Sequence, residues 1–415
     1  MVPPLPFEIW VQIVLHLSND ELGQLLCVNK ALYEISMNSR YKTLRARWPD
    51  NATVTKLRML RDTVSVAERV QDLEISYRIL EVLWRARSTR FRRLRNQFRC
   101  LISLFSRDRA ALTSKSIASI ERLLVGAVNN MHGLRSVLFN LHPFDGLVER
   151  YLPMVVQVWL LLSTRVDSLS ICVWAKHASL LRPTFSSILG MKHLSISLRG
   201  IYQGEACGLA DLINTASESL ESLRLEMFLV STSSLVHRIF NGLHGLSRLR
   251  RVDLSFYNTV GCEGVNFLNA HGETIEELEL SICPTAGGGT FNIAALHLPR
   301  LRKLSVEWNP FNWGGSLNTP FQHFWASADF PMLNCLEITS PFMEARSIAG
   351  FCNAFKRPGG NRVQRLQFPC HTLNAEVFDH LWEAFSNLHT LILPTIFLSN
   401  PNHEAPDWNI VRLSL

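Results

Sequence analysis

The sequence has 415 residues, of which 47% are hydrophobic, and a formal net charge of +7 at pH 7. A chain of this length is too long to form one ordinary hydrophobic core, so we expect several domains or an array of repeats. Residues 1–110 carry 19 Lys and Arg against 11 Asp and Glu, whereas residues 111–415 carry 23 against 24. A near-neutral rear part argues against a protein that binds nucleic acid along its whole length.

The lack of a recognisable targeting signal and the distribution of the cysteines indicate where in the cell the protein is found. No apolar run reaches the length of a membrane span, and the N-terminus lacks the pattern of a secretory signal. The nine cysteines are scattered without any C-x-x-C pair, which favours buried thiols in a reducing compartment over a zinc site. We therefore expect a cytoplasmic or nuclear protein, or both, with no membrane association, no metal and no cofactor.

The first element in chain order is a helical head. Pro6 suits the first turn of a helix, and Ile9, Ile13 and Leu17 recur at helical spacing on one apolar stripe. The sequence Ser18-Asn19-Asp20-Glu21 has the pattern of a capping box and predicts the start of a second helix. A third helix carries Leu32, Tyr33 and Ile35. Three such short helices bury little core, so the stripe requires a partner.

Four segments of this head share a known pattern. They are Leu5-Pro6-x-Glu8-Ile9, Ile13-Val14-x-x-Leu17, Asp20-x-Leu22 and Val28-Asn29-Lys30-x-Leu32-Tyr33. The head resembles the F-box, in a variant familiar from fungal proteins, although Trp10 stands where a smaller aliphatic residue is usual. The resemblance implies binding to a Skp-type adaptor and, through it, to cullin and RING subunits of a ubiquitin ligase. The adaptor contacts that it implies are Leu5, Pro6, Ile9, Ile13, Leu17, Leu22, Leu25 and Val28. An ordinary three-helix cap on a solenoid is the alternative.

A short phrase, apolar-x-x-Leu-x-apolar, recurs after the head. Because Pro49 forbids easy continuation of a helix, we assign residues 1–48 to the head, 49–69 to a linker helix region and 70–415 to the repeats. Copies of the phrase begin at Val70, Leu134, Val166, Met191, Leu220, Leu249, Ile275, Leu301, Leu333, Val363, Leu388 and Ile410. Twelve copies, mostly 22–32 residues apart, predict a solenoid.

Helical stretches separate the phrases, at residues 116–130, 205–219, 231–243, 343–355 and 374–385. Alternating strands and helices predict an α/β fold with parallel strands on one side and helices on the other. The whole resembles F-box proteins with a leucine-rich-repeat horseshoe. The expected fold is therefore a short all-α F-box head followed by a solenoid of about 11–12 divergent repeats. No helical pattern follows the last strand, so we expect the last repeat to be either truncated or covered by another element.

Two segments interrupt the repeats. Residues 85–109 hold nine arginines. They either bind nucleic acid, an acidic lipid surface or an import receptor, or form a solvated helix or loop whose apolar residues pack on the solenoid. The helical spacing of Leu94, Phe98, Leu101 and Phe105 favours packing. The aromatic segment at residues 308–325 is either a partner-binding loop or a small satellite core.

The positions beside the core leucines are candidates for binding a partner, because strand side chains alternate between two faces. In the middle repeats they are Glu226, Asp253, Glu277, Glu279, Glu307 and Glu337, with Arg224, Arg251 and Lys303 between them. This acid-leaning stripe either binds a substrate protein or is simply a soluble inner face. No catalytic motif is present. The resemblance implies a non-catalytic substrate-recognition subunit of an SCF-type cullin–RING ligase. A scaffold without a ligase role, or a nucleic-acid-associated factor using the arginines, are the alternatives.

Overall fold

The computed structural model describes residues 5–25, 27–47, 50–79, 114–141, 152–185, 188, 190–200, 208–228, 233–256, 262–282, 295–308, 330–340, 343, 345–356, 362–398 and 409–414. The arginine-rich insert at 85–109 lies outside these residues, as does the aromatic segment beyond Trp308. The chain divides into two compact units, Met1–Cys172 and Val173–Leu415.

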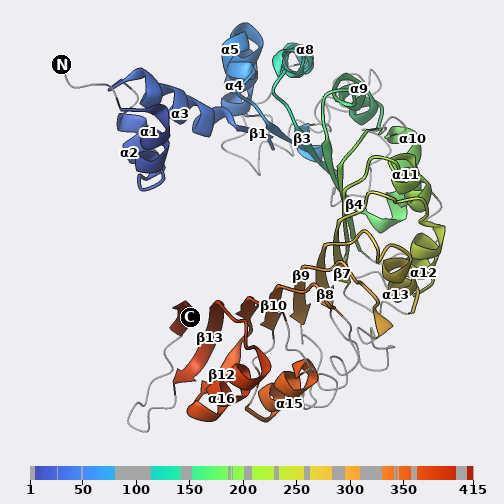
Figure 1. The fold of residues 1–415 in the computed structure, drawn as a ribbon. Coiled ribbons are helices and arrows are strands. Elements are labelled where there is room, and N and C mark those ends of the chain that lie inside the picture. The colour runs from blue at the N-terminus through green and yellow to red at the C-terminus, as the bar shows by residue number, and fades with distance from the viewer. Residues whose placement is uncertain are drawn as a thin grey trace, which may run out of the picture. The chain divides into compact units, whose positions relative to one another are not determined.

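The first unit begins with three helices and continues as strands alternating with helices (Figure 1). Its elements are α1 (Phe7–Val14), α2 (Asn19–Gln24), α3 (Lys30–Tyr41), β1 (Thr43–Ala46), α4 (Asn51–Asp62), α5 (Val64–Ala67), β2 (Asp72–Ser76), α8 (Ser114–Asn130), β3 (Ser136–Leu141) and α9 (Leu152–Leu162). The strand β4 (Ser168–Trp174) spans the boundary between the units.

The three predicted helices of the head are present, and side-chain caps fix where two of them begin. The Ser18 backbone N–H donates to Glu21 Oε2 at 2.7 Å, and the Glu21 backbone N–H donates to Ser18 Oγ at 3.3 Å. This is the predicted capping box at the start of α2. Asn29 caps α3 by accepting a hydrogen bond from the Leu32 N–H at 2.8 Å.

The strand β1 corrects the prediction that residues 44–49 simply end the helical head. Leu44 and Ala46 are buried and alternate with exposed neighbours, as in a half-buried strand. β1 pairs in parallel with β2, which places Leu44 beside Leu73 and Ala46 beside Ile75. The sheet of this unit therefore starts before the first copy of the repeated phrase and follows directly on α3.

The second unit consists of strands, many of them separated by helices. Its elements are the 3-10 helix η2 (Ala175–Leu180), α10 (Leu181–Thr184), β5 (His193–Arg199), α11 (Leu209–Thr215), β6 (Ser222–Phe228), α12 (Ser233–Gly242), β7 (Arg251–Phe256), α13 (Cys262–Ala270), β8 (Glu277–Ile282), β9 (Lys303–Trp308), β10 (Cys335–Ser340), α15 (Ala345–Phe355), β11 (Arg365–Gln367), β12 (Cys370–Leu373), α16 (Ala375–Ala384), β13 (Thr390–Leu398) and β14 (Asn409–Ser414). The described helices of this unit cover one face of the sheet (Figure 1). None of them covers the other face, which we call the open face.

Rows of apolar side chains in register form the core of this unit. The central row is Leu194, Leu223, Val252, Leu278, Leu304, Leu336, Leu366 and Leu391, one residue from each consecutive parallel strand. All eight are buried. All twelve copies of the phrase form strands. The fold is an α/β leucine-rich-repeat solenoid, and the predicted fold class is confirmed.

The last copy of the phrase departs from the expected parallel arrangement. β14 runs antiparallel to β13, with Thr390 opposite Ser414 and Thr395 opposite Asn409. The expectation of a twelfth parallel repeat at Ile410 is therefore wrong. An antiparallel return strand covers an edge of β13 that would otherwise carry unpaired backbone groups.

The register predicts that substitutions on the two faces of one strand differ greatly in their effect on the free energy of unfolding. Replacing Leu278, which is fully buried in the central row, with Ala should lower the free energy of unfolding by about 2–5 kcal/mol. Replacing Ser281, on the other face of β8, with Ala should change it by less than about 0.5 kcal/mol. Hydrogen exchange of β7 to β9 in increasing urea measures both effects, and equal losses would contradict the assigned register.

Candidate functional site

The head presents apolar side chains that its own helices do not cover. No residue of α1 is buried, although its sequence FEIWVQIV is largely apolar. The exposed large apolar residues of the head are Leu5, Phe7, Ile9, Ile13, Leu15, Val28 and Tyr33, which we call the head surface. Single exposed apolar residues are normal on proteins, but this concentration within one small module marks an interaction site.

The predicted adaptor contacts divide by exposure. Leu5, Pro6, Ile9, Ile13 and Val28 are exposed, whereas Leu17 and Leu25 are half-buried. Of the eight predicted contacts, only Leu22, at 5% exposure, is buried.

The head surface is also wider than the stripe read from the sequence. Phe7, Leu15 and Tyr33 are also exposed, but the helical spacing of three or four residues that starts at Ile9 did not identify them. Their apolar character is the only signal in the sequence that could have identified them.

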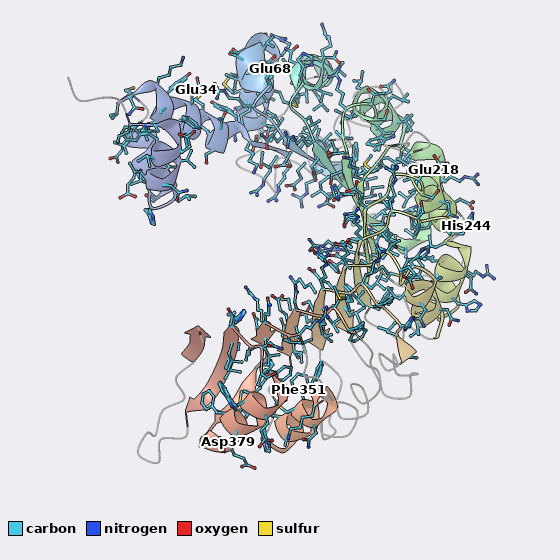
Figure 2. The ribbon with its side chains drawn as sticks, viewed as in Figure 1. Glu34, Glu68, Glu218, His244, Phe351 and Asp379 are labelled. Carbon is cyan, nitrogen blue, oxygen red and sulfur yellow. The ribbon has the colours of Figure 1, made fainter. Side chains whose placement is uncertain are left out.

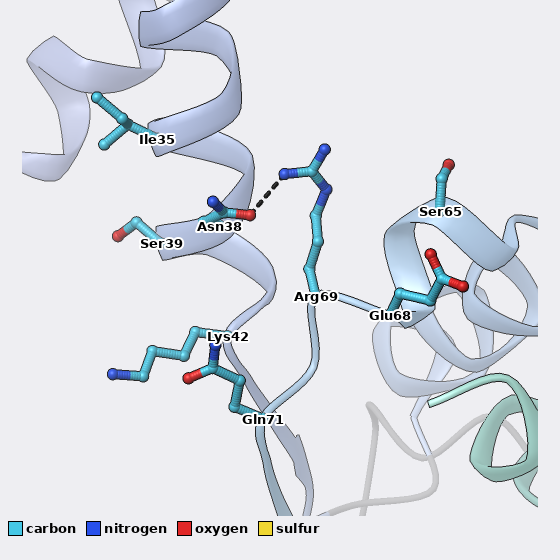
Figure 3. Close-up of a pocket in the computed structure, with 8 residues that line it drawn as sticks. All are labelled: Ile35, Asn38, Ser39, Lys42, Ser65, Glu68, Arg69 and Gln71. Carbon is cyan, nitrogen blue, oxygen red and sulfur yellow. Dashed lines mark hydrogen bonds between the residues drawn. The ribbon is translucent and has the colours of Figure 1, made fainter. Parts of the chain in front are cut away.

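An arginine joins the head to the rest of the first unit (Figure 3). Arg69, between α5 and β2, donates from Nη1 to Asn38 Oδ1 at 2.5 Å and from Nη2 to Glu34 Oε2 at 2.6 Å. Both acceptors are on α3, so this contact fixes the last helix of the head beside the start of the sheet. The Tyr41 hydroxyl adds a second link, 3.5 Å from the sulfur of Met59 on α4.

An open pocket of about 640 Å³ lies at this junction. It is lined by Ile35, Asn38, Ser39, Lys42, Ser65, Glu68, Arg69 and Gln71 (Figure 3). Most of these side chains are exposed, and the charges of Lys42 and Arg69 are offset by Glu68 and by Glu34 beside Arg69. The pocket therefore favours neither anions nor apolar ligands.

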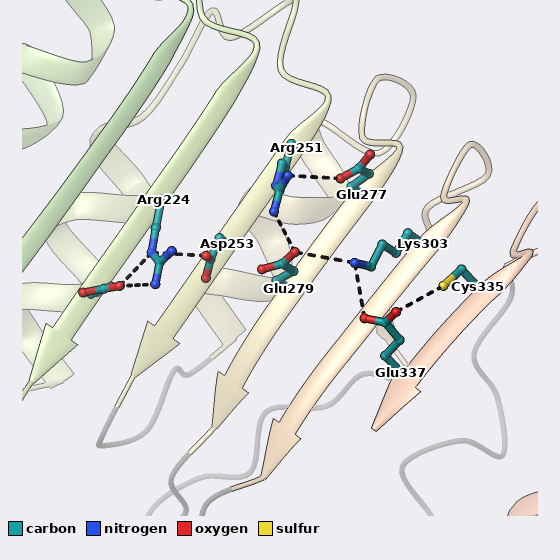
Figure 4. Close-up of polar contacts among 9 residues, drawn as sticks. Arg224, Arg251, Asp253, Glu277, Glu279, Lys303, Cys335 and Glu337 are labelled. Atoms are coloured by element: carbon teal, nitrogen blue, oxygen red, sulfur yellow. Dashed lines mark hydrogen bonds and ion pairs between the residues drawn. The ribbon is translucent and has the colours of Figure 1, made fainter. Parts of the chain in front are cut away.

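Charged residues of the second unit lie in two aligned rows on the open face (Figure 4). Strand register places Arg251, Glu277, Lys303, Cys335 and Arg365 side by side. The next row, two residues further along each strand, contains Arg224, Asp253, Glu279, Ser305 and Glu337. Oppositely charged side chains thus face one another both along and between the rows.

These side chains form two neighbouring groups of ion pairs, one around Arg224 and one that runs from Arg251 to Arg365, which together we call the ladder. Arg224 contacts Glu226 and also Asp253, with 3.2 Å between Nε and Oδ2. Arg251 reaches Glu277 at 3.6 Å and Glu279 at 2.7 Å. Further along, Lys303 Nζ lies 3.9 Å from Glu279 and 3.2 Å from Glu337, which Arg365 approaches at 3.4 Å.

The ladder changes the interpretation of the acid-leaning stripe. Five of the six predicted substrate-binding acids, all except Glu307, are paired with a cation from the same or an adjacent strand. Burial raises the pKa of Asp253, while the neighbouring Arg224 opposes that rise. Glu307 is exposed and has no ion pair within the described residues. The open face therefore offers a polar surface of mixed charge rather than a free acidic one.

The described residues hold no arrangement typical of a metal centre. No group of three or more His, Cys, Asp or Glu side chains among them could hold an ion. Within the same part of the chain, no helix combines the length and the apolarity needed to cross a membrane.

No protein-family model and no curated protein matches the sequence. Several solved structures resemble it at low identity. The leucine-rich repeat-containing protein LegL7 from Legionella pneumophila is 12% identical, with a TM-score of 0.44 over 88% of this chain and 94% of that chain. The yeast Rad7 and Elc1 complex is 13% identical, with a TM-score of 0.41 over 96% and 89%. The TLR13–ssRNA13 complex is 17% identical, with a TM-score of 0.39, and the match covers 67% of this chain but only 35% of that one. Similarity at this level carries no functional information.

The ladder makes a prediction for the reactivity of Cys335, whose Sγ lies 3.7 Å from Glu337 Oε1. Burial, reinforced by the negative charge of Glu337, raises the pKa of Cys335 to about 11. At pH 8 the thiol is therefore protonated, and we expect iodoacetamide to modify it on the order of tenfold more slowly than an unperturbed thiol. Its rate should rise with pH up to about pH 11.

Mass spectrometry of alkylated peptides checks this prediction, with the exposed Cys27 as the internal reference. The variant Glu337→Gln removes a negative charge that raises the pKa, so it should speed modification of Cys335 at pH 8. A rate for Cys335 that already levels off near pH 9 in the unaltered chain would show that the thiol is not perturbed.

Proposed function

We propose that this chain is the non-catalytic substrate-recognition subunit of an SCF-type cullin–RING ubiquitin ligase. The observation that carries the proposal is the head surface, a set of uncovered apolar side chains on a three-helix module with the sequence pattern of an F-box. Such a module binds a Skp-type adaptor, which brings the cullin and RING subunits. The substrates held by the chain are then ubiquitinated and degraded by the proteasome.

The energetics of the head support this assignment. Burying one large apolar side chain on binding contributes on the order of 1.5–3 kcal/mol before the entropic cost of association. The head surface offers several such side chains, which suffice for a stable complex with an apolar groove. The head has few buried residues of its own, so a partner also stabilises its folded state.

We assign the open face of the second unit to substrate binding. A parallel sheet whose rows are in register is a rigid platform, because each strand is held by its neighbours. Its mixed charges suit a polar protein surface, with Glu307 and the half-exposed Glu277 the most accessible acids of the set. Holding a lysine of that protein near activated ubiquitin raises its effective concentration without any chemistry by this chain.

The adaptor contact can be tested on exposed positions that the fold does not need. Ile9 is 45% exposed and Val28 is 61% exposed. The double change Ile9→Asp and Val28→Asp buries unpaired carboxylates at the interface, each costing several kcal/mol. We expect the Kd for a purified Skp-type adaptor, measured by calorimetry, to rise at least about a hundredfold.

A matched control is Val64→Asp, at an apolar position of the same unit that is 46% exposed but lies outside the head. It should leave the adaptor Kd unchanged. Adaptor binding that survives the double change would refute the F-box assignment. A chain that never binds the adaptor yet still captures protein partners would instead be a leucine-rich-repeat scaffold without a ligase role.

The open face is tested by reversing its two most accessible acids. Glu277→Lys and Glu307→Lys together should reduce ubiquitination of the chain's substrates while adaptor binding is kept. The effect should shrink at high salt, because exposed charges are screened beyond roughly 8–10 Å at physiological ionic strength.

Proximity labelling with the unaltered chain under proteasome inhibition first defines the substrate set. Glu218→Lys is the matched control, since Glu218 is an exposed acid on the helical side of the same unit (Figure 2). Equal losses from the control and from the double reversal would mean that general charge, rather than the open face, determines capture.

A further inference from the structure

Two large aromatic side chains stand exposed on α16. Trp382 is 75% exposed and Phe378 is 38% exposed, one helical turn apart. Trp is normally among the most covered residues, because its ring removes a large apolar area from water when it packs. An exposed pair of this kind marks a contact site that the described residues of the chain do not fill.

The exposed pair lies on a different side of α16 from the residues that contact the core and the end of α15. Val377, Leu381 and Ala384 face the core. At the neighbouring side, Glu383 accepts a hydrogen bond from Lys356, which follows α15, at 2.5 Å. At about 100° per residue, Trp382 points well away from both the core and this contact.

The interface between α15 and α16 shows how helices in this unit pack on one another. Phe385 at the end of α16 lies 5.9 Å from Phe351 and 5.4 Å from Phe355, measured between ring centroids. Both partners belong to α15, so aromatic side chains join consecutive helices here. Among the described residues of this unit, no helix follows α16, and the next strands are β13 and β14. The exposed pair therefore occupies the position where one more helix of the stack would pack.

The charges around the pair select the partner. Asp379 is an exposed carboxylate about 60° around α16 from Trp382, and it points away from the sheet (Figure 2). The nearest cation on the same helix is His380, which lies 3.8 Å from Glu376 and is charged only when protonated. A second copy of α16 packed against the first would place Asp379 beside an equally acidic helix, which is unfavourable. Basic side chains on the partner would instead be attracted.

We propose that Phe378 and Trp382 are a docking site for an amphipathic helix of another protein, with basic residues flanking its apolar stripe. The apolar stripe packs on the two rings and continues the stack of helices beyond α16. Lysine or arginine beside the stripe pairs with Asp379. This site is independent of the adaptor contact and of the open face.

The test uses a display library of helical peptides of about 18 residues, with an apolar stripe and flanks randomised between Lys, Arg, Asp and Glu. The library is selected on the full chain and counter-selected on the Trp382→Ala variant. We expect enriched peptides with Lys and Arg flanks, and a Kd at least tenfold weaker for Trp382→Ala by fluorescence anisotropy. Asp379→Lys should weaken the same peptides and improve peptides with acidic flanks.

Two exposed positions elsewhere are matched controls. Leu160→Ala removes an apolar side chain that is 60% exposed on α9, and Glu218→Lys reverses an exposed acid. Both should bind the enriched peptides as the unaltered chain does. Because Trp382 and Asp379 are exposed, their variants keep the fold, which an unchanged melting temperature verifies.

Three results would overturn the proposal. The first is a library with no peptide that prefers the unaltered chain to Trp382→Ala. The second is equal enrichment of acidic and basic flanks. The third is concentration-dependent self-association of the chain that Trp382→Ala abolishes, since the occupant would then be a second copy.

Discussion

The structure of the second unit depends on strand register. Each parallel strand places one apolar residue in the same central row, from Leu194 on β5 to Leu391 on β13. Because side chains alternate, a slip of one residue would turn the whole row toward the open face. The same register that buries the leucines also aligns the ladder, since its charged residues occupy the alternate positions. Apolar packing on one face and the ion pairs on the other are therefore one property of the chain.

The head follows the opposite principle. It has few buried side chains, and its position in the first unit rests on Arg69, on the Tyr41–Met59 contact and on the covalent continuation into β1. A module with so little core gains stability from whatever covers it. Exposed apolar residues on the head and a filled core in the repeats thus divide the chain into a part that needs a partner and a part that does not.

Repetition made most of the fold predictable. A single copy of the phrase is ambiguous, but twelve copies specify strands, and all twelve formed. The β1 strand was missed because its second apolar position is Ala46, too small to stand out. The antiparallel direction of β14 was missed because strand direction leaves no mark in a short apolar pattern. The sequence identified the charged residues of the ladder but not their ion pairs, because these pairs depend on which residues the register places side by side. For the head, periodicity found Ile9 and Ile13 but could not separate the buried Leu22 from its exposed neighbours.

The ladder has a mechanical consequence. In an array where each strand touches only its neighbours, a force that pulls on the two ends passes through every strand boundary in series. Arg251 bonds acids on β8, and Lys303 on β9 bonds acids on both adjacent strands, so these pairs bridge successive boundaries between repeats. At these boundaries the ion pairs act beside the buried central row, so a boundary separates only when both its charged and its apolar contacts break. Under tension the second unit should therefore lengthen in steps, one boundary at a time, beginning with the weakest.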